Sequence, residues 1–452
     1  MTPRNRLQAG AAAADITPLN SQFLYGYPHV ARWSTGVHDP LTSSALALDD
    51  GATRLLFIAN DIIYVPKDLV ARARRRIAEA TGTPAGQIMV TATHTHSGPV
   101  VQDRGPGSYD TVVPNADPAY LDRLEAGIVQ AGIDACRALR PAVVGLALAR
   151  VEGIGTNRRD PAGPADPEIP VLAAREADSD RLIGIMEVYA MHPTVLHEDS
   201  TLVTGDFPAM ARRYLQERLG PSLPVLHHMG AAGNQSPRHC VRGQTFDEAI
   251  RLGTILGRAV ESALARIVFR SDLVLAAAGT AVEYPLRELP TIEAAAAKVA
   301  AVRAKLARQR EDGTPRALVR TTECDLFGAE ASHALARSQA DGRIAEALRR
   351  CMPAEIQLLA VGPWRFIGWQ GEAFIEYALA LRADDPDTFV CSCANGTMAG
   401  YIATEQAAAE GGYEASTSVF STDSGRLLVE ESRRLLASLP RAVTPGTPSR
   451  AT

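Results

Sequence analysis

Short apolar runs alternate with longer amphipathic stretches from residue 37 to residue 270. Runs of branched and aromatic residues predict strands, and apolar positions that repeat every three or four residues predict helices. The predicted strands are residues 54–63, 88–96, 143–151 and 182–192. The predicted helices are residues 68–81, 119–139, 207–219 and 246–267. Because the two kinds of element alternate, we expect an α/β fold with a mixed β-sheet core flanked by helices.

Residues 291–351 break this alternation and read as helical. Thr291 precedes a stretch dense in good helix formers, residues 294–310, and is predicted to be its N-cap. A break at residues 311–315 separates this helix from a second one predicted at residues 329–350. We expect a helical hairpin inserted on the sheet domain, with ordinary packing as the simpler interpretation and a lid as the alternative.

The sequence after this insertion predicts how the domain ends. Residues 355–361 and 364–369 flank Gly362-Pro363, a pattern typical of a β-hairpin. Residues 441–452 are rich in Pro, Ser and Thr, which predicts a disordered tail. We therefore expect one domain over residues 1–440.

The composition is typical of a globular protein, with 46% apolar residues, 21% charged residues and a net charge of −5 over 452 residues. This balance excludes a chain disordered throughout, and the dispersed basic residues give no reason to expect nucleic acid as a partner. Because no apolar run reaches the roughly 18 residues of a membrane span, we expect no stable membrane insertion. Arg4 and Arg6 precede an alanine run that Asp15 interrupts, which argues against an export signal and favours a cytoplasmic protein.

The six cysteines contain no CxxC pair, which fits a reducing compartment. Cys391 and Cys393 would share one face of a strand. Two buried free thiols are the simpler interpretation of this pair, and metal ligands are the alternative.

Two histidines stand at the end of a predicted strand, in His94-Thr95-His96. Side chains two apart in a strand point the same way, so both imidazoles would leave one face of the sheet. Ser97-Gly98-Pro99 then turns the chain, and ligand sites in open α/β sheets form beyond such strand ends. This arrangement favours a metal or catalytic role for His94 and His96 over a structural one.

His192 ends a second predicted strand, just before Pro193. Alone it would be interpreted as a core histidine, but together with His94 it could supply a second nitrogen ligand to zinc. Glu372 follows Gly371 directly after a predicted strand, and the glycine would let this carboxylate approach a metal closely.

Other polar residues have a structural interpretation beside a functional one. Asp206 precedes a predicted helix and is more simply its N-cap, and Asp39 and Asp61 are interpreted as structural acceptors. Residues 230–237 form a small-residue loop, which is either flexible or a wall of backbone N–H donors facing a substrate oxygen. Ser236 in this loop lacks the flanking glycines of a GxSxG nucleophile elbow.

The chain resembles the catalytic domain of the neutral/alkaline non-lysosomal ceramidase family. The most distinctive matching segment is residues 92–99, Ala-Thr-His-Thr-His-Ser-Gly-Pro. The other matching segments are residues 13–18, 36–41, 157–159, 166–168, 192, 205–206, 233–237, 371–372, 401–404 and 413–415. The resemblance implies a ceramidase-like fold and a zinc-dependent hydrolase that cleaves a linear N-acyl amide by a metal-activated water.

The resemblance also implies roles for individual residues. Zinc would be held by four side chains: His94, His192, Glu372 and Tyr401. His96 would handle a proton or support the oxyanion, and the residues lining the reacting carbonyl would be Arg158, Ser236 and Tyr413. Asn234 stands where the family commonly has an acidic residue, and the chain ends soon after the last matching segment. We therefore expect a short form without the family's C-terminal immunoglobulin-like domain.

Alternatives remain for the activity and the partners. The substrate would be a small acylated amide, either ceramide or a soluble compound, and a homo-oligomer is compatible with the sequence. A zinc-dependent esterase or lactonase on the same scaffold, or a metal-bound binding protein without turnover, are the other interpretations. A barrel-type amidohydrolase is disfavoured, because a (β/α)₈ barrel has no place for a purely helical segment at residues 291–351.

Overall fold

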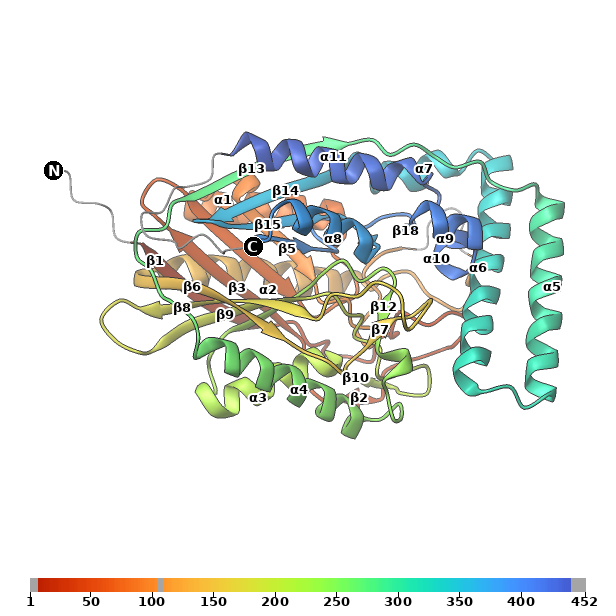
Figure 1. Ribbon diagram of the computed structural model, residues 1–452, viewed down its shortest axis with the longest axis horizontal. Coiled ribbons are helices and arrows are strands. Elements are labelled where there is room, and N and C mark those ends of the chain that lie inside the picture. Colours follow the sequence, from red (N-terminus) through yellow and green to blue (C-terminus); the bar gives the residue numbers. More distant parts are fainter. Residues whose placement is uncertain (1–6, 104–108, 440–452) are drawn as a thin grey trace.

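The computed structural model describes residues 7–103 and 109–439. Its centre is an eight-stranded sheet accompanied by a four-stranded sheet, with helices on the outside (Figure 1). The predicted tail at residues 441–452 and the basic residues Arg4 and Arg6 lie outside the described residues.

The large sheet is mixed, as predicted. In spatial order its strands are β11 (Val225–Met229), β9 (Leu182–Tyr189), β8 (Glu168–Glu176), β6 (Arg140–Arg150), β1 (Gln8–Asp15), β3 (Thr42–Asp49), β4 (Arg54–Asn60) and β5 (Ile88–Ala92). The pairs β4–β5 and β9–β11 are parallel, whereas the pairs between β4 and β9 are antiparallel. The sheet curls so that β11 also approaches β3, β4 and β5.

The second sheet contains β13 (Leu275–Val282), β14 (Ala354–Val361), β15 (Trp364–Trp369) and β17 (Thr388–Cys391). The predicted hairpin at Gly362-Pro363 is confirmed, since β14 and β15 pair antiparallel across it. Alternate side chains of the two sheets meet in one core, where Phe57 of β4 packs edge-on against Phe366 of β15. This shared core fixes the second sheet against the first.

Helices cover the outer faces of both sheets. The half of the large sheet formed by β1, β3, β4 and β5 is covered by α1 (Lys67–Thr81) and α2 (Pro118–Arg137). The other half is covered by α3 (Asp206–Leu219) and α4 (Phe246–Leu264), and the second sheet by α8 (Ile375–Asp384) and α11 (Asp423–Ser438). In Figure 1, α3 and α4 run along one side of the sheets and α11 along the opposite side.

The helical insertion forms a hairpin at one end of the molecule, on the right in Figure 1. It consists of α5 (Ile292–Glu311), packed along α6 (Arg316–Ala340), and a short α7 (Ile344–Arg349). The predicted cap is confirmed, because the Ala294 amide donates to Thr291 Oγ1 at 3.2 Å. The prediction of one helix at residues 329–350 was wrong: α6 begins at Arg316, and a turn with Gly342 at φ 71° separates it from α7.

Three predicted strands end earlier than the sequence pattern suggested. The strands predicted at 54–63, 88–96 and 182–192 stop at Asn60, Ala92 and Tyr189. Beyond them the apolar residues continue, but the backbone turns: the His94 amide donates to the Ile62 carbonyl, outside the sheet ladder. Apolar runs therefore located these strands but did not locate their ends, because the loops that follow are buried too.

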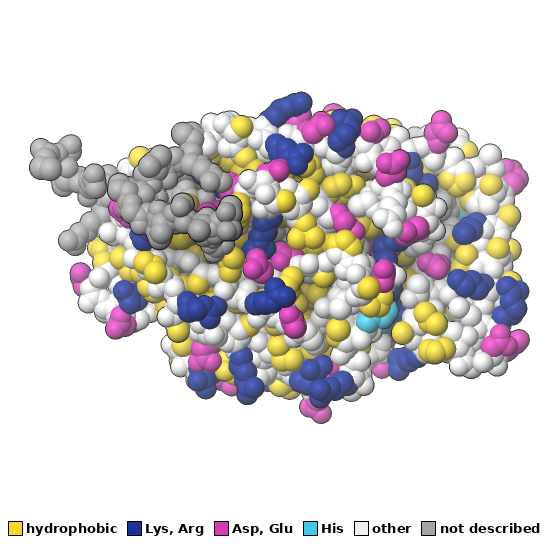
Figure 2. All heavy atoms as spheres, viewed as in Figure 1, with side chains coloured by type: hydrophobic (Ala, Val, Ile, Leu, Met, Phe, Trp, Pro, Cys, Tyr) yellow, Lys and Arg dark blue, Asp and Glu magenta, His cyan; other side chains and the backbone are white. Residues whose placement is uncertain are grey.

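The surface seen in Figure 2 carries basic and acidic side chains interspersed, without a large area of one sign. Within residues 7–103 and 109–439, no helix combines the length and the apolar character needed to cross a bilayer.

A close contact between α3 and α4 gives a test of this packing. A Cβ added at Gly253 of α4 would lie 2.4 Å from Met210 Cβ and 2.6 Å from the Phe207 carbonyl oxygen. Gly→Ala inside a helix ordinarily stabilises by about 1 kcal/mol. Here overpacking of about 1–3 kcal/mol should outweigh that gain, because the contacts include backbone that cannot move aside. We expect Gly253→Ala to lower the urea midpoint of unfolding.

The matched control is Gly86→Ala in the short 3₁₀ turn η1 (Ala85–Gln87), where an added Cβ would meet no heavy atom within 4 Å besides its chain neighbours. Its urea midpoint should stay near that of the wild type. A Gly253→Ala midpoint equal to or above that of the wild type would show that the helices do not approach this closely.

Candidate metal and active site

Three histidines from distant parts of the chain converge at one point. Candidate ligand atoms of His94, His96 and His192 all lie within 4.8 Å of one another. The ring centroids of His94 and His192 are 4.8 Å apart, and those of His94 and His96 are 5.0 Å apart. Both segments leave the large sheet after a strand, His94 after β5 and His192 after β9.

The reason predicted for the pairing of His94 with His96 was wrong, although the two side chains do meet. They do not share the face of a strand, because β5 ends at Ala92 and His94 has a left-handed backbone with φ 68°. Backbone hydrogen bonds of this turn hold it: the Thr93 amide donates to Asn60 and the His94 amide to Ile62. A loop therefore brings the two imidazoles together.

Backbone carbonyls fix how two of the imidazoles present their nitrogens. His94 Nδ1 lies 2.8 Å from the Ile63 oxygen, and His192 Nδ1 lies 2.9 Å from the Gln235 oxygen. A carbonyl only accepts, so in neutral His94 the Nδ1 carries the proton and the Nε2 carries a lone pair. In His192 both nitrogens face acceptors, because Glu372 Oε2 lies 3.0 Å from Nε2, and a cation between them would take the place of a proton there. Both Nε2 atoms face Glu372 Oε2, at 3.4 Å from His94 and 3.0 Å from His192.

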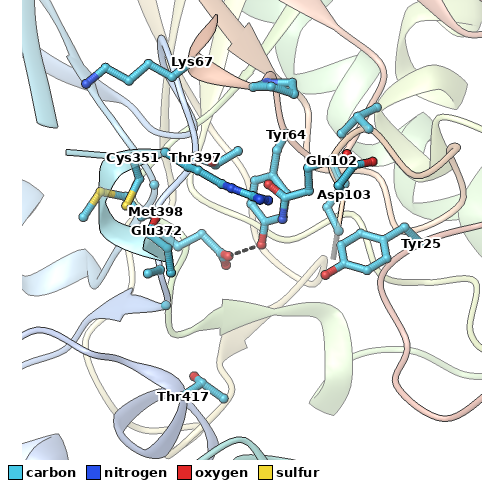
Figure 3. Close-up of a pocket in the computed structure, with 18 of the residues that line it drawn as sticks. Tyr25, Tyr64, Lys67, Gln102, Asp103, Cys351, Glu372, Thr397, Met398 and Thr417 are labelled. Atoms are coloured by element: carbon cyan, nitrogen blue, oxygen red, sulfur yellow. Dashed lines mark hydrogen bonds between the residues drawn. The ribbon is translucent and has the colours of Figure 1, made fainter. Parts of the chain in front are cut away.

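Glu372 brings a buried carboxylate to these histidines from the second half of the chain. It lies on β16 (Glu372–Ala373), and its Oε1 accepts a hydrogen bond of 2.8 Å from the Tyr64 hydroxyl, drawn in Figure 3. Burial raises the pKa of Glu372, but His94, His192 and Arg158 outweigh that effect and hold the pKa below its usual value. The residue is therefore a carboxylate at neutral pH.

The histidines are neutral under the same conditions. Burial lowers the pKa of His94 to about 4, and it also lowers the pKa values of His96 and His192. Neutral imidazoles and a carboxylate are the donor forms that a divalent metal requires. Neither ring nitrogen of His96 has a hydrogen-bond partner among the described residues, which leaves both available to a bound group.

Tyr401, Tyr413 and Arg158 lie beside this group. Tyr401 of β18 (Tyr401–Ile402) pairs with Glu372 across a two-stranded ladder, and its ring centroid is 5.8 Å from that of Tyr413. The Arg158 guanidinium carbon is 5.4 Å from the Tyr401 ring centroid. Arg158 itself is held by Glu414 Oε1 at 2.7 Å and by the Gly233 oxygen at 2.8 Å.

Ser236 follows Gln235, whose carbonyl oxygen binds His192. Like His192 and Arg158, Ser236 is not among the described residues that line the cavity that opens onto this site, and its hydroxyl accepts from the Arg238 amide at 3.3 Å. The loop at residues 230–237 is buried, and three amides of the predicted wall of donors are not free. The amides of Gly230, Gly233 and Gln235 all donate to backbone carbonyls. The loop contributes carbonyl oxygens instead, to His192 and Arg158.

The remaining sequence predictions concern structural residues. Asp206 is not an N-cap: it is the first residue of α3, with φ 58°, and its Oδ2 accepts from the Val195 and Leu196 amides, each at 3.0 Å. Burial raises its pKa to about 7. The two hydrogen bonds of Asp206 Oδ2 tie α3 to the loop that follows His192. Asp39 and Asp61 are confirmed as structural acceptors, bound by Thr204 and Thr42.

The predicted free thiols are confirmed for Cys391 and Cys393, which are both buried. Cys393 Sγ lies 3.6 Å from His94 Nδ1, on the side away from Glu372. Burial raises the pKa of the Cys393 thiol, so it remains protonated behind the histidine.

The sequence interpretation missed Tyr64. Its hydroxyl binds Glu372, its ring packs edge-on against His94 with centroids 5.0 Å apart, and the preceding Ile63 accepts from His94 Nδ1. A signal was available, because Tyr64 follows β4 as His94 follows β5, and these strands are parallel neighbours. The reasoning applied to His94 would have placed Tyr64 at the same edge.

A cavity of about 880 Å³ opens onto His94, His96 and Glu372. Its deep wall includes His94, His96, Tyr401 and Tyr413, and its outer walls come from the start of α1, from α6 and from α7. Polar side chains shown in Figure 3 line it as well: Tyr25, Lys67, Gln102, Asp103, Thr397 and Thr417. The site is therefore accessible to a molecule of considerable size.

Known proteins resemble this chain in sequence and in fold. Residues 7–225 match the family described as neutral/alkaline non-lysosomal ceramidase, N-terminal. A curated relative, neutral ceramidase of Mycobacterium tuberculosis (strain ATCC 25618 / H37Rv), is 26% identical over 234 residues. That alignment spans only 36% of the relative's length.

Two solved structures share the fold over nearly the whole chain. Neutral ceramidase from Pseudomonas aeruginosa gives a TM-score of 0.72 at 18% identity, covering 98% of this chain and 76% of that one. A structure described as ceramidase complexed with C2 gives a TM-score of 0.70 at 16% identity, and the match covers 98% of this chain and 77% of that one. At these identities the likeness establishes the fold, which is the mixed α/β architecture predicted from the sequence.

The hydrogen bond between Tyr64 and Glu372 gives a test of the candidate metal site. Groups that hold a ligating carboxylate in place typically contribute 10- to 100-fold to metal affinity or activity. We expect Tyr64→Phe to weaken zinc binding by about that factor, measured by competition with a chromophoric chelator. The control is Tyr120→Phe, which removes another buried hydroxyl, one with no hydrogen-bond partner in the described chain. Equal zinc affinity in both variants would show that Tyr64 does not contribute to the candidate metal site.

Proposed function

We propose that this chain, which belongs to the neutral/alkaline non-lysosomal ceramidase family, is a zinc-dependent hydrolase of linear N-acyl amides. One observation carries the proposal: the Nε2 atoms of His94 and His192 face a single oxygen of a buried carboxylate, Glu372 Oε2, at the bottom of an open cavity. Two imidazoles and a carboxylate, with room for water and substrate, are a donor set typical of catalytic zinc.

The fourth position around such an ion is proposed for Tyr401. This residue is the ladder neighbour of Glu372 and lines the same cavity. Burial raises the pKa of its hydroxyl, and Glu372 adds to that effect while Arg158 opposes it. The guanidinium of Arg158 beside Tyr401 therefore favours the ionised form that a metal ligand requires.

The reaction follows from the chemistry of the amide. A bound divalent ion would polarise the carbonyl and lower the pKa of a water to about 7. The charge that develops on the carbonyl oxygen would be stabilised by Arg158 and Tyr413, whose other contacts hold them in place before substrate arrives. His96, with two unpartnered nitrogens, would transfer the proton to the departing nitrogen.

Polar groups around the cavity support a soluble substrate in preference to ceramide. Besides the tyrosines, its walls present Lys67, Gln102, Asp103 and Thr397 together with the apolar residues Leu335, Ile344 and Leu348. Alkyl chains packed against these walls would displace water from such polar groups without offering hydrogen bonds in return, at a cost of about 1–3 kcal/mol for each group left buried and unpaired. An acylated amide with a polar portion matches these walls better.

The first test of this proposal uses the metal itself. His94→Ala and His192→Ala should each lower bound zinc, measured by elemental analysis, and abolish hydrolysis of N-acyl amides of graded chain length. Zinc restored to chelator-treated wild-type protein should restore turnover. Stoichiometric zinc in both variants would refute the ligand set.

Paired amide and ester substrates with the same acyl group distinguish the reaction types. Faster turnover of the ester is expected from its better leaving group, so the proposal requires measurable amide turnover. An ester-only enzyme would be an esterase or lactonase on this scaffold. No zinc-dependent turnover of either series would indicate a binding protein.

The second test concerns His96. We expect His96→Ala to keep its zinc but lower kcat by about 10²- to 10⁴-fold, the usual contribution of proton transfer by a positioned side chain. His228→Ala is the control, because His228 is another buried histidine, held by Thr91 in the core. Loss of zinc from the His96 variant would make His96 a ligand, and an unchanged kcat would exclude it from the reaction.

A further inference from the structure

The long helix α6 contacts the segment of chain that packs on His96. Its Arg320 binds Glu198 through two hydrogen bonds, of 3.0 and 3.4 Å, and its guanidinium carbon lies 5.9 Å from the Tyr27 ring centroid. Two turns further along the helix, Phe327 packs against His29 with centroids 5.7 Å apart. Glu330 Oε2 then lies 2.7 Å from His29 Nε2.

The segment held in this way forms the wall behind His96. The rings of Tyr27 and His96 have centroids 5.2 Å apart, and the Tyr27 hydroxyl donates to the Leu196 carbonyl at 2.6 Å. Gly26, with φ 129°, approaches so closely that an added Cβ would lie 2.5 Å from His96 Cγ. The buried Arg32 donates to the His96 carbonyl at 2.9 Å.

Packing is the main restraint on the His96 ring. Neither of its nitrogens has a hydrogen-bond partner among the described residues, in contrast to His94 and His192, whose Nδ1 atoms bind carbonyls. Its orientation therefore depends on Gly26 and Tyr27, and their position depends in turn on Arg320 and Glu330.

The same helix also supports Tyr413. A Cβ added at Gly328 of α6 would lie 2.9 Å from Tyr413 Cα and 3.1 Å from Ser416 Cβ. The backbone of α10 (Tyr413–Thr417) therefore rests directly on α6. One helix thus contacts the surroundings of the two residues, His96 and Tyr413, that border the candidate reaction centre.

We propose that Arg320 of the helical insertion is a positioning residue for His96, acting through Tyr27, and that α6 is a functional part of the active site as well as a wall of its cavity. The inference rests on the proposed function, because it assigns α6 a role in that reaction. The hairpin of α5 and α6 would then affect the rate of the chemical step, in addition to limiting which substrates fit the cavity.

The principal variant is Arg320→Ala. Misplacing a reacting group by about 1 Å can cost up to about 100-fold in rate. We expect kcat to fall by about 10- to 100-fold, with KM and zinc content close to those of the wild type. Arg320→Lys, which keeps a cation between Glu198 and Tyr27, should recover most of the loss.

The control is Arg310→Ala, on α5. It removes an ion pair of 2.7 Å with Glu323 of α6, a residue that also binds Arg320 at 3.2 Å, but it leaves Arg320 and its contacts with Glu198 and Tyr27 in place. Its kcat should match that of the wild type. Thermal unfolding of all variants identifies any global destabilisation, and Glu198→Gln, which removes the same ion pair from the other side, replaces Arg320→Ala if that variant does not fold.

A second readout does not depend on turnover. In protein labelled with ¹⁵N-histidine, the ring signals of His96, identified by their loss in His96→Gln, should shift in Arg320→Ala and stay in place in Arg310→Ala. Unshifted signals with wild-type kcat would overturn the inference. A raised KM with an unchanged kcat would overturn it as well. Absence of any amide or ester turnover in the wild type would refute the proposed function, and the His96 signals would still decide whether Arg320 positions that ring.

Discussion

The burial of one carboxylate is the constraint on which the centre of this molecule depends. Glu372 is almost inaccessible to solvent, and an ionised group in that position must be compensated by partners. Tyr64 donates to one of its oxygens, two imidazoles face the other, and Arg158 lowers its pKa from nearby. His94, His192 and Arg158 are in turn hydrogen-bonded to backbone carbonyls, so their side chains are oriented before any ion or substrate is bound.

The fold class and the candidate metal site could be predicted from the sequence, because residue types and their order along the chain indicate both. Histidines and an acid beside apolar runs pointed to a metal site, and alternating patterns gave the α/β class. The positions of strand ends could not be predicted. His94 adopts a left-handed backbone that only its hydrogen bonds to the β4 loop explain, and no local pattern encodes them.

Ser236 and the loop around it show a second limit. Small residues suggested amide donors facing a substrate, but the tertiary structure uses three of those amides in backbone hydrogen bonds and presents carbonyls to His192 and Arg158. Asp206 is a similar case, since its bonds to the Val195 and Leu196 amides involve residues ten or more positions away. Helix capping rules consider only near neighbours, so they assigned this carboxylate to its own helix.

The three candidate ligands do not belong to one sheet. His94 and His192 follow strands of the large sheet, whereas Glu372 follows β15 of the second sheet. A cation shared by them would bridge the two sheets across their common core and would find no complete set of donors until both had docked. Its binding energy would therefore count as folding energy: each tenfold rise of free ion above its dissociation constant would add about 1.4 kcal/mol to the native state. The concentration of free ion would thus affect the stability of the folded protein as well as its activity.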